Sequence, residues 1–463
     1  MELKGQSERL GTEPVGRLLA NLSIPAVVGM LVMALYNVVD TIFIARAVGT
    51  IGVAATSIVF PVQMIMMAVA GAIGIGGASV ISRRLGAGQV DEANRVFGNV
   101  NTLVLIVSLL SFLVGILFLE EILTLFGASE AILPYARDFL GILLFGTFFF
   151  TFGFAMNNVV RSEGNAKVAM MTMILGAGLN IIFNPIFIFG LGWGIKGSAL
   201  ATVLAQGLTT LYLLYYFASG KSTLTFKWSN LRLKWAYIKE ILAIGSSSFI
   251  HQTTSSLMFV LVNYLLIAHG GELAVAVFGI INRIIMFSIM PMIGVMQGVM
   301  PIVGYNYGAR KYDRISSTVR LAYKVTFIIG SIVFVMTMAF PRPLFSIFTR
   351  DPQVLEMGET ALRLIFLLCA TIGFQMVTGG VFQALGKARA ALILSMSRQI
   401  LFLIPLLLIL PLFWDLIGVW LSFTISDALG FLLSFFYMWS HRDLLLYAME
   451  GKNRTRESHQ FLK

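Results

Sequence analysis

Long apolar stretches recur along this 463-residue chain, and they constrain its fold more than any other feature. A helix needs about 20 mostly apolar residues to cross a bilayer. Only 12% of the residues are charged and the mean hydropathy is +0.87, so the chain cannot cover itself with polar surface. The pattern predicts an all-α integral membrane protein with twelve transmembrane helices. Their approximate bounds are 18–45, 51–79, 96–119, 131–160, 166–190, 194–218, 238–268, 273–304, 317–340, 353–384, 388–410 and 414–439.

Positive charges alternate from one side of the predicted spans to the other. Lys and Arg gather before the first span, in the connections after spans two, four, six, eight and ten, and in the carboxy-terminal tail. Cytoplasmic connections of membrane proteins carry this excess, so we expect both termini in the cytoplasm. The net charge of +11 follows from the same bias and favours contact with anionic lipid over nucleic-acid binding.

The two halves of the chain carry an internal repeat. "RRLGAGQVDEA" after span two matches "YNYGARKYDRI" after span eight, and the same separation of 222 residues (308 − 86) persists elsewhere. At this separation Gly49 pairs with Gly271, Gly86 with Gly308, Phe126 with Phe348 and Gly164 with Gly386. A register that holds over so much of each half predicts two copies of one six-helix unit.

The repeat also predicts the domain organisation. Six spans per half is an even number, so the halves insert in the same direction, as in parallel-repeat transporters. We expect an amino-terminal lobe at 1–218, a cytoplasmic linker at 219–237, a carboxy-terminal lobe at 238–440 and a basic tail at 441–463. Two six-helix lobes around a V-shaped central cleft would give alternating access by rocking one lobe against the other.

One carboxylate, Asp40, stands inside the first span. An acid at the centre of a bilayer costs at least ~2.5 kcal/mol, so it is a functional hypothesis by default. Tyr36 lies one helical turn before it; Asn180 and Asn184 repeat the i, i+4 spacing on span five, and Thr202 lies on span six. Asp40, Asn184 and Thr202 fall at similar depths, roughly 8–12 Å below the outer surface. The depths predict one shared polar site.

Two interpretations of this polar group stay open. The carboxylate, two amides and a hydroxyl could bind a coupling cation or exchange a proton. Alternatively they are an interhelical hydrogen-bond cluster that only stabilises the lobe. Pro25, about four turns from Asp40, marks either a bend that moves during transport or a tolerated kink.

The sequence predicts the residues that contact substrate less specifically than it predicts the polar site. The chain holds 23 Met and 37 Phe, and thioethers with aromatic faces suit flat, lipophilic cations, although ordinary packing explains most of them. We expect Asn157, Gln206 and Gln252 to line the cavity. The roles of Arg283, Arg398 and Asp427 stay open between pairing within the fold and lining the cleft.

Signatures of enzymes and metal sites are missing from the sequence. Cys369 is the single cysteine, the four histidines show no ligand spacing, and the glycine-rich segments lie inside spans rather than after strands. We therefore expect no enzymatic activity, no metal, no cofactor beyond H⁺ or Na⁺ as coupling ion, and a monomer in the bilayer.

Four segments resemble one family. They are "LSIPAVVGMLVMALYNVVDTIFIAR", "RRLGAGQVDEANRVFGN", "NNVVRSEGNAKVAM" and "SRQILFLIPLLLILP". In this order they resemble the multidrug and toxic compound extrusion (MATE) transporters of the MOP flippase superfamily, in their prokaryotic DinF- and MepA-like branch. The resemblance implies export of cationic drugs or toxic compounds across a prokaryotic plasma membrane by antiport with H⁺ or Na⁺. It also implies Asp40 as coupling residue, supported by Asn180, Asn184 and Thr202.

One departure from the family pattern bears on the choice of coupling ion. Relatives commonly carry a second acid at the position of Asn184, so a single negative charge here favours proton exchange over tight Na⁺ binding. Two other functions have signatures of their own. A lipid-linked-oligosaccharide flippase should line its cleft with several Arg or Lys, and a membrane transferase should cluster acids or histidines at one face; the chain shows neither pattern.

Overall fold

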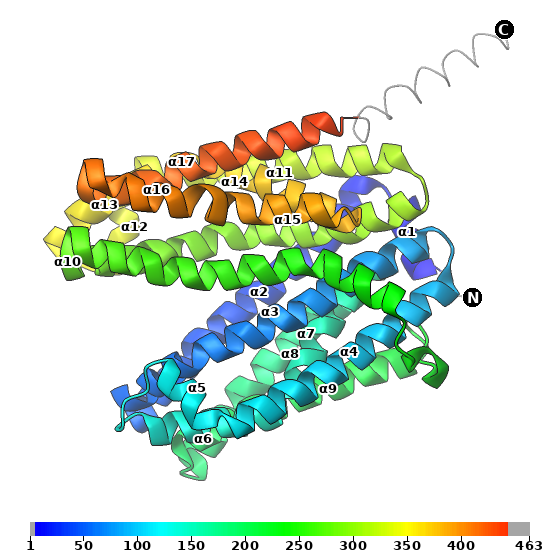
Figure 1. Cartoon of the computed structure of the whole chain (residues 1–463), viewed down its shortest axis with the longest axis horizontal. Helices are drawn as coiled ribbons and strands as arrows, with labels where there is room; N and C mark the ends of the chain where they lie inside the picture. The colour runs from blue at the N-terminus through cyan, green and yellow to red at the C-terminus, as the bar shows by residue number, and fades with distance from the viewer. Residues whose placement is uncertain (1–4, 443–463) are drawn as a thin grey trace, which may run out of the picture. The chain divides into compact units, whose positions relative to one another are not determined.

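The computed structural model describes residues 5–442, and every regular element in that range is helical (Figure 1). The first half contains α1 Gly5–Thr12, α2 Val15–Val48, α3 Thr50–Gly86, α4 Val90–Leu117, α5 Leu119–Leu125, α6 Leu133–Phe145, α7 Thr147–Ser162, α8 Ala166–Pro185, the π-helix η1 Ile186–Gly190, α9 Gly194–Ala218 and the 3-10 helix η2 Trp228–Leu231. The second half contains α10 Trp235–Gly308, α11 Tyr312–Ala339, α12 Pro341–Ser346, α13 Pro352–Phe366, α14 Cys369–Ala384, α15 Ala388–Met396, the π-helix η3 Ser397–Leu403, α16 Ile404–Ile409 and α17 Pro411–Ser440.

The helix lengths confirm the predicted all-α membrane fold. Nine helices of the described part are long and apolar enough to cross a bilayer, and the bent pairs α6–α7 (58°) and α13–α14 (45°) raise the number to eleven. Helix α10 counts twice, because its 74 residues would extend about 110 Å against a hydrocarbon core of about 30 Å. Its helical conformation breaks at Gly271, and the rings of Phe259 and Phe278, one on each side, lie 6.1 Å apart. The chain therefore folds back on itself there and makes twelve spans.

The backbone repeats where the sequence repeats. Gly49 (φ 75°, ψ −160°) separates α2 from α3, and Gly271 (φ 65°, ψ −165°) breaks α10 in the same conformation. Gly164 and Gly386 also share a positive φ, 86° and 74°. Residues with a side chain rarely adopt a positive φ, so the turns at these paired positions require glycine.

Contacts divide the described chain into two compact units. Unit 1 comprises residues 5–10 and 24–249, and unit 2 comprises 11–23 and 250–442. Helices α2 and α10 thus contribute to both units. Most of the predicted tail, from 443 onward, lies outside the described residues. One hydrophobic core of unit 1 gathers around Ala55, Leu140 and Ala199, and that of unit 2 around Phe278, Phe345 and Trp420.

The segment between α9 and α10 packs against unit 1. The backbone N–H of Thr225 donates to Asn94 Oδ1 at 2.8 Å, and that of Lys234 donates to Asn99 Oδ1 at 2.8 Å. A Cβ on Gly98 would collide with the backbone of Asn230, so only glycine lets α4 approach this closely. Side chains of α4 therefore satisfy backbone groups of a segment that has little regular structure of its own.

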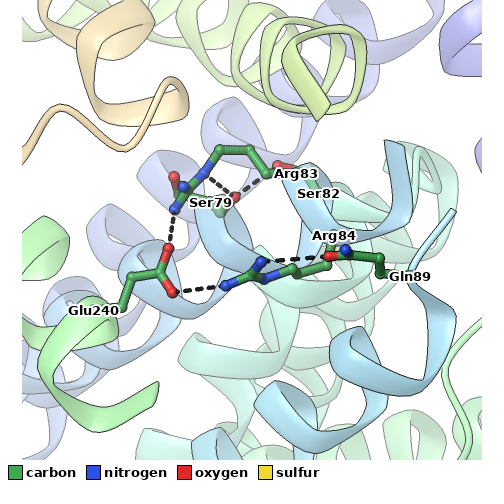
Figure 2. A network of polar contacts seen from close by, with 6 residues as sticks. All are labelled: Ser79, Ser82, Arg83, Arg84, Gln89 and Glu240. Atoms are coloured by element: carbon green, nitrogen blue, oxygen red, sulfur yellow. Dashed lines mark hydrogen bonds and ion pairs between the residues drawn. The ribbon is translucent and has the colours of Figure 1, made fainter. Parts of the chain in front are cut away.

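An ion-pair network attaches the start of α10 to the end of α3 (Figure 2). Glu240 accepts from Arg83 Nη2 at 3.0 Å and from Arg84 Nη2 at 3.4 Å, and all three side chains are partly exposed. Arg84 also donates to Gln89 at 3.3 Å. The first turns of α10 are thus connected to α3 within unit 1.

Candidate functional site

Asp40 of α2 lies half-buried in unit 1 and is bonded only to neutral groups. Its Oδ1 accepts a hydrogen bond from Asn184 Nδ2 at 2.6 Å and one from Ser198 Oγ at 3.2 Å. Among the described residues no Lys, Arg or His lies within ion-pair distance of it. A carboxylate in such a setting is compensated by dipoles rather than by a fixed positive charge.

The polar contacts continue from Asp40 through α8 to α9. Asn184 Nδ2 also donates to Asn180 Oδ1 at 2.5 Å, and Asn180 Nδ2 donates to Thr202 Oγ1 at 2.9 Å. Thr202 in turn donates to the carbonyl of Ser198 at 3.0 Å. We call Asp40, Asn180, Asn184, Ser198 and Thr202 the Asp40 cluster. It joins three helices by one connected network.

Local backbone features bring these side chains together. Asn184 is followed by Pro185, which lacks the N–H that would continue α8, and the π-helix η1 begins at the next residue. On α9, a Cβ at Gly197 would lie 2.7 Å from the carbonyl of Phe187, so glycine permits a close approach to η1. The close approach places Ser198 beside the end of α8.

One acceptor of the cluster has no donor. Asn184 Oδ1 is buried and makes no hydrogen bond within the described part of the chain. An unsatisfied buried acceptor costs about 1–3 kcal/mol. A proton on a neighbouring carboxyl group or a small cation would supply what this oxygen lacks.

Four residues predicted from depth and spacing, Asp40, Asn180, Asn184 and Thr202, meet in this cluster. Tyr36 lies one turn before Asp40 on α2 and is half-buried, and its part in the site stays a prediction. The sequence prediction missed Ser198. Its position one helical turn before Thr202, on the same face of α9, was the available signal.

The residues predicted to line the substrate cavity make no hydrogen bond to the Asp40 cluster in the described part of the chain. Asn157 donates to Thr172 Oγ1 at 2.6 Å and to the carbonyl of Ala169 at 2.8 Å, so it connects α7 to α8. Gln206 of unit 1 and Gln252 of unit 2 are half-buried. Their contact with substrate stays a prediction. Pro25 is buried in α2, two residues beyond Ser23, where that helix passes from unit 2 to unit 1.

The intramembrane arginines differ in their surroundings. Arg398 of η3 forms an ion pair with Asp427 of α17, Nε to Oδ1 at 2.5 Å, and Gln375 Nε2 donates to the Asp427 carbonyl at 3.0 Å. Arg283 of α10 is exposed and has no ion pair or hydrogen bond in the described range. Residues 5–442 contain no group of three His, Cys, Asp or Glu side chains that could hold a metal ion.

Comparisons with known proteins agree with this architecture. The MatE family model matches the chain twice, at residues 25–186 and 248–409. The multidrug export protein MepA of Staphylococcus haemolyticus (strain JCSC1435) is 27% identical over 431 residues, covering 93% of this chain and 94% of that protein. MepA of Staphylococcus aureus (strain MRSA252) is 25% identical over 437 residues, covering 93% and 95%.

Solved structures show the same fold. The MATE multidrug transporter DinF-BH, solved with a bound ligand, is 51% identical, with a TM-score of 0.88 over 95% of this chain and 99% of that one. A MATE structure in the bent conformation is 28% identical, with a TM-score of 0.90 over 96% and 99%. The two matches of the family model fall in the two halves of the internal repeat and together cover more than half of the sequence. The chain is therefore a polytopic membrane protein that belongs to the MATE (MatE) transporter family, among its DinF- and MepA-like members.

Proposed function

We propose that this transporter exports lipophilic, cationic or amphipathic compounds in exchange for protons, with Asp40 as the coupling carboxylate. The observation that carries the proposal is the environment of Asp40: a half-buried acid, hydrogen-bonded to Asn184 and Ser198, with no basic partner in the described part of the chain. A positively charged partner for this carboxylate must therefore be a bound ion or ligand. A proton and a cationic substrate are two such partners, and their competition for one site would couple opposite fluxes.

The chemistry of the cluster favours H⁺ over Na⁺ as the coupling ion. The cluster contains one carboxylate, and among its neutral amide and hydroxyl oxygens only Asn184 Oδ1 is left without a hydrogen bond in the described part of the chain. A dehydrated metal cation needs several free oxygen ligands at once, whereas a proton needs one oxygen. The flippase alternative draws no support from this cluster, because none of its members is a cation that could hold a pyrophosphate.

The proposal also covers the membrane orientation of the chain, its oligomeric state and the bending of α2. The distribution of basic residues supports cytoplasmic termini, and the names of the relatives support a plasma-membrane location. We also propose that the transporter works as a monomer and that α2 bends at Pro25 during the cycle. The missing N–H of this proline lowers the cost of bending the helix there.

Uptake by proteoliposomes tests the coupling. Vesicles containing the parent chain, Asp40→Asn or the control Asp138→Asn would be given a pH gradient, a Na⁺ gradient or none, with rhodamine 6G as the fluorescent cation. Asp138 is a suitable control because it is a partly exposed acid of unit 1 paired with Lys196 at 3.2 Å. Uptake driven by the pH gradient should be lost in Asp40→Asn and kept in Asp138→Asn. Gradient-driven uptake that survives in Asp40→Asn would refute the proposal.

A further inference from the structure

Unit 2 contains a second polar site inside the membrane, built around Arg398. Arg398 lies 10 residues from the start and 11 from the end of the span Ala388–Ile409, so it stands at mid-depth. Asp427, which pairs with it, stands near the middle of α17. A charged pair at this depth is costly, and in membrane transporters such positions mark pathways more often than ordinary packing.

The guanidinium group of Arg398 is fixed at one edge and available at the other. Its Nε donates to Asp427 Oδ1 at 2.5 Å, and this is the only hydrogen bond that it makes within residues 5–442. The side chain of Asp427 is 1% exposed, whereas that of Arg398 is 30% exposed. Asp427 therefore orients the plane of the guanidinium group through Nε. The N–H groups of both terminal nitrogens remain available to donate hydrogen bonds to another group.

The neighbouring residues hold the pair in position. Gln375 of α14 donates to the backbone carbonyl of Asp427 at 3.0 Å. A Cβ on Gly430 would collide with the Gln375 side chain, and Arg398 Cβ lies 3.6 Å from the same point, so glycine leaves the room that both side chains occupy. The backbone that carries Arg398 is the π-helix η3, and single π-turns in helices often occur at functional sites.

The accessible edge cannot face hydrocarbon. Unbonded N–H groups in lipid cost several kcal/mol each, so the exposed side of Arg398 must meet water or a ligand. The adjacent Gln399 bonds to Ser255 of α10 at 2.9 Å, so this face of unit 2 is polar beyond the arginine itself. Two parallel N–H donors on a planar cation match the two oxygens of a carboxylate.

We infer that the Arg398–Asp427 pair is a substrate subsite that receives the carboxylate of zwitterionic substrates through the two terminal nitrogens of Arg398. The inference rests on the proposed function, because it assumes that the transported compounds carry a positive charge. It assigns a residue of unit 2 to the recognition of the acid group in substrates that also carry a positive charge. Asp427 acts as a positioning residue, which orients Arg398 without touching the substrate.

Two dyes that differ in one group test the subsite. Rhodamine 6G carries an ethyl ester, and rhodamine 19 has the same ring system with a free carboxylate in its place. Binding of each dye to the full chain in lipid nanodiscs would be measured by fluorescence anisotropy. Arg398→Gln should weaken the binding of rhodamine 19 at least about tenfold and change that of rhodamine 6G less than about twofold. Arg398→Lys, which keeps the charge without the fork, should fall between the parent and Arg398→Gln.

Two further variants separate binding from folding. Arg398→Gln leaves Asp427 buried without a partner, so Arg398→Gln/Asp427→Asn repeats the test without that charge. Arg350→Gln removes an exposed arginine of the same unit, in the connection between α12 and α13, and should leave both dyes unaffected. Equal losses for the two dyes, no loss for rhodamine 19, or a parent chain that does not bind rhodamine 19 would each overturn the inference. Failure of the proposed function is distinguishable, because it appears as rhodamine 6G uptake that does not depend on Asp40.

Discussion

The attachment of the segment between α9 and α10 should weaken as the pH rises, because it depends on a buried acid. Glu163 lies between α7 and α8, outside the spans, and is 1% exposed. Its Oε2 accepts hydrogen bonds from Ser222 Oγ at 2.7 Å and from the backbone N–H of Thr223 at 2.6 Å and Leu224 at 3.3 Å. Burial raises the pKa of Glu163 from 4.5 to about 7, although these hydrogen bonds oppose the rise.

The sign and size of the effect follow from the two pKa values. When the segment is detached, Glu163 meets water and titrates near 4.5; when it is attached, the pKa is about 7. Between these values the attached state binds more protons, so attachment is strongest below pH 4.5 and weakens until the pH exceeds 7. The difference of 2.5 (7 − 4.5) corresponds to about 3 kcal/mol, or roughly a three-hundredfold change in the opening equilibrium over the whole titration.

Glu163→Gln is the informative perturbation, since an uncharged amide resembles the protonated acid and does not titrate. Hydrogen exchange of the amides of Thr223 and Leu224, corrected for the intrinsic rate at each pH, reports opening of the segment. Between pH 5 and 8 the parent should lose roughly a hundredfold in protection, and Glu163→Gln should stay flat. Asp91→Asn, which removes an exposed acid at the start of α4, should follow the parent. Identical pH profiles for the parent and Glu163→Gln would show that the buried carboxylate does not control attachment.

Three other predictions test packing and pairing. Ser198→Ala removes the hydroxyl that donates to Asp40 at 3.2 Å. Loss of this hydrogen bond, worth about 0.5–1.5 kcal/mol, should slow proton-driven dye uptake roughly two- to tenfold. Unchanged uptake would show that Ser198 does not act in the cluster. Gly245→Ala places a Cβ against the Ala72 backbone and should destabilise by about 1–3 kcal/mol or more in thermal unfolding, whereas Gly279→Ala, with nothing within 4 Å, should not. Asp427→Asn leaves the charge of Arg398 unpaired and should lower the free energy of unfolding by about 1–3 kcal/mol, a moderate loss because the Arg398 side chain is partly exposed. The double variant Arg398→Met/Asp427→Asn should recover part of this loss. If the losses of the two single variants simply add in the double variant, the two residues do not interact.

Much of the fold follows from patterns with a direct physical cause. The twelve spans are predictable because a bilayer accepts only long apolar helices. The repeat is predictable because turns such as those at Gly49 and Gly271 need a backbone region that favours glycine. The bend between α13 and α14 carries no such signal, and Gly146, at the bend between α6 and α7, has a φ of −84° that any residue can adopt. Neither break contains a proline, and the bends depend on tertiary packing that a single sequence does not reveal.

The candidate site was predictable as far as depth and helical spacing reach. Equal depth brought Asp40, Asn184 and Thr202 together because side chains at one level of adjacent helices can meet. Depth did not predict the bond of Asn157 to Thr172, because that contact depends on how α7 and α8 pack against each other. Glu163 was missed because its role depends on backbone donors of a segment about 60 residues later in the chain, and no local pattern encodes such a contact.

The most direct test of the central claim measures proton release on substrate binding. Rhodamine 6G would be added to the purified transporter in weakly buffered solution containing a pH indicator, over a range of starting pH values. If a proton and the cationic dye compete for Asp40, the parent chain releases protons when the dye binds, and Asp40→Asn binds the dye without releasing any. Equal proton release by the parent and Asp40→Asn, or dye binding by the parent with no release at any pH, would contradict the account.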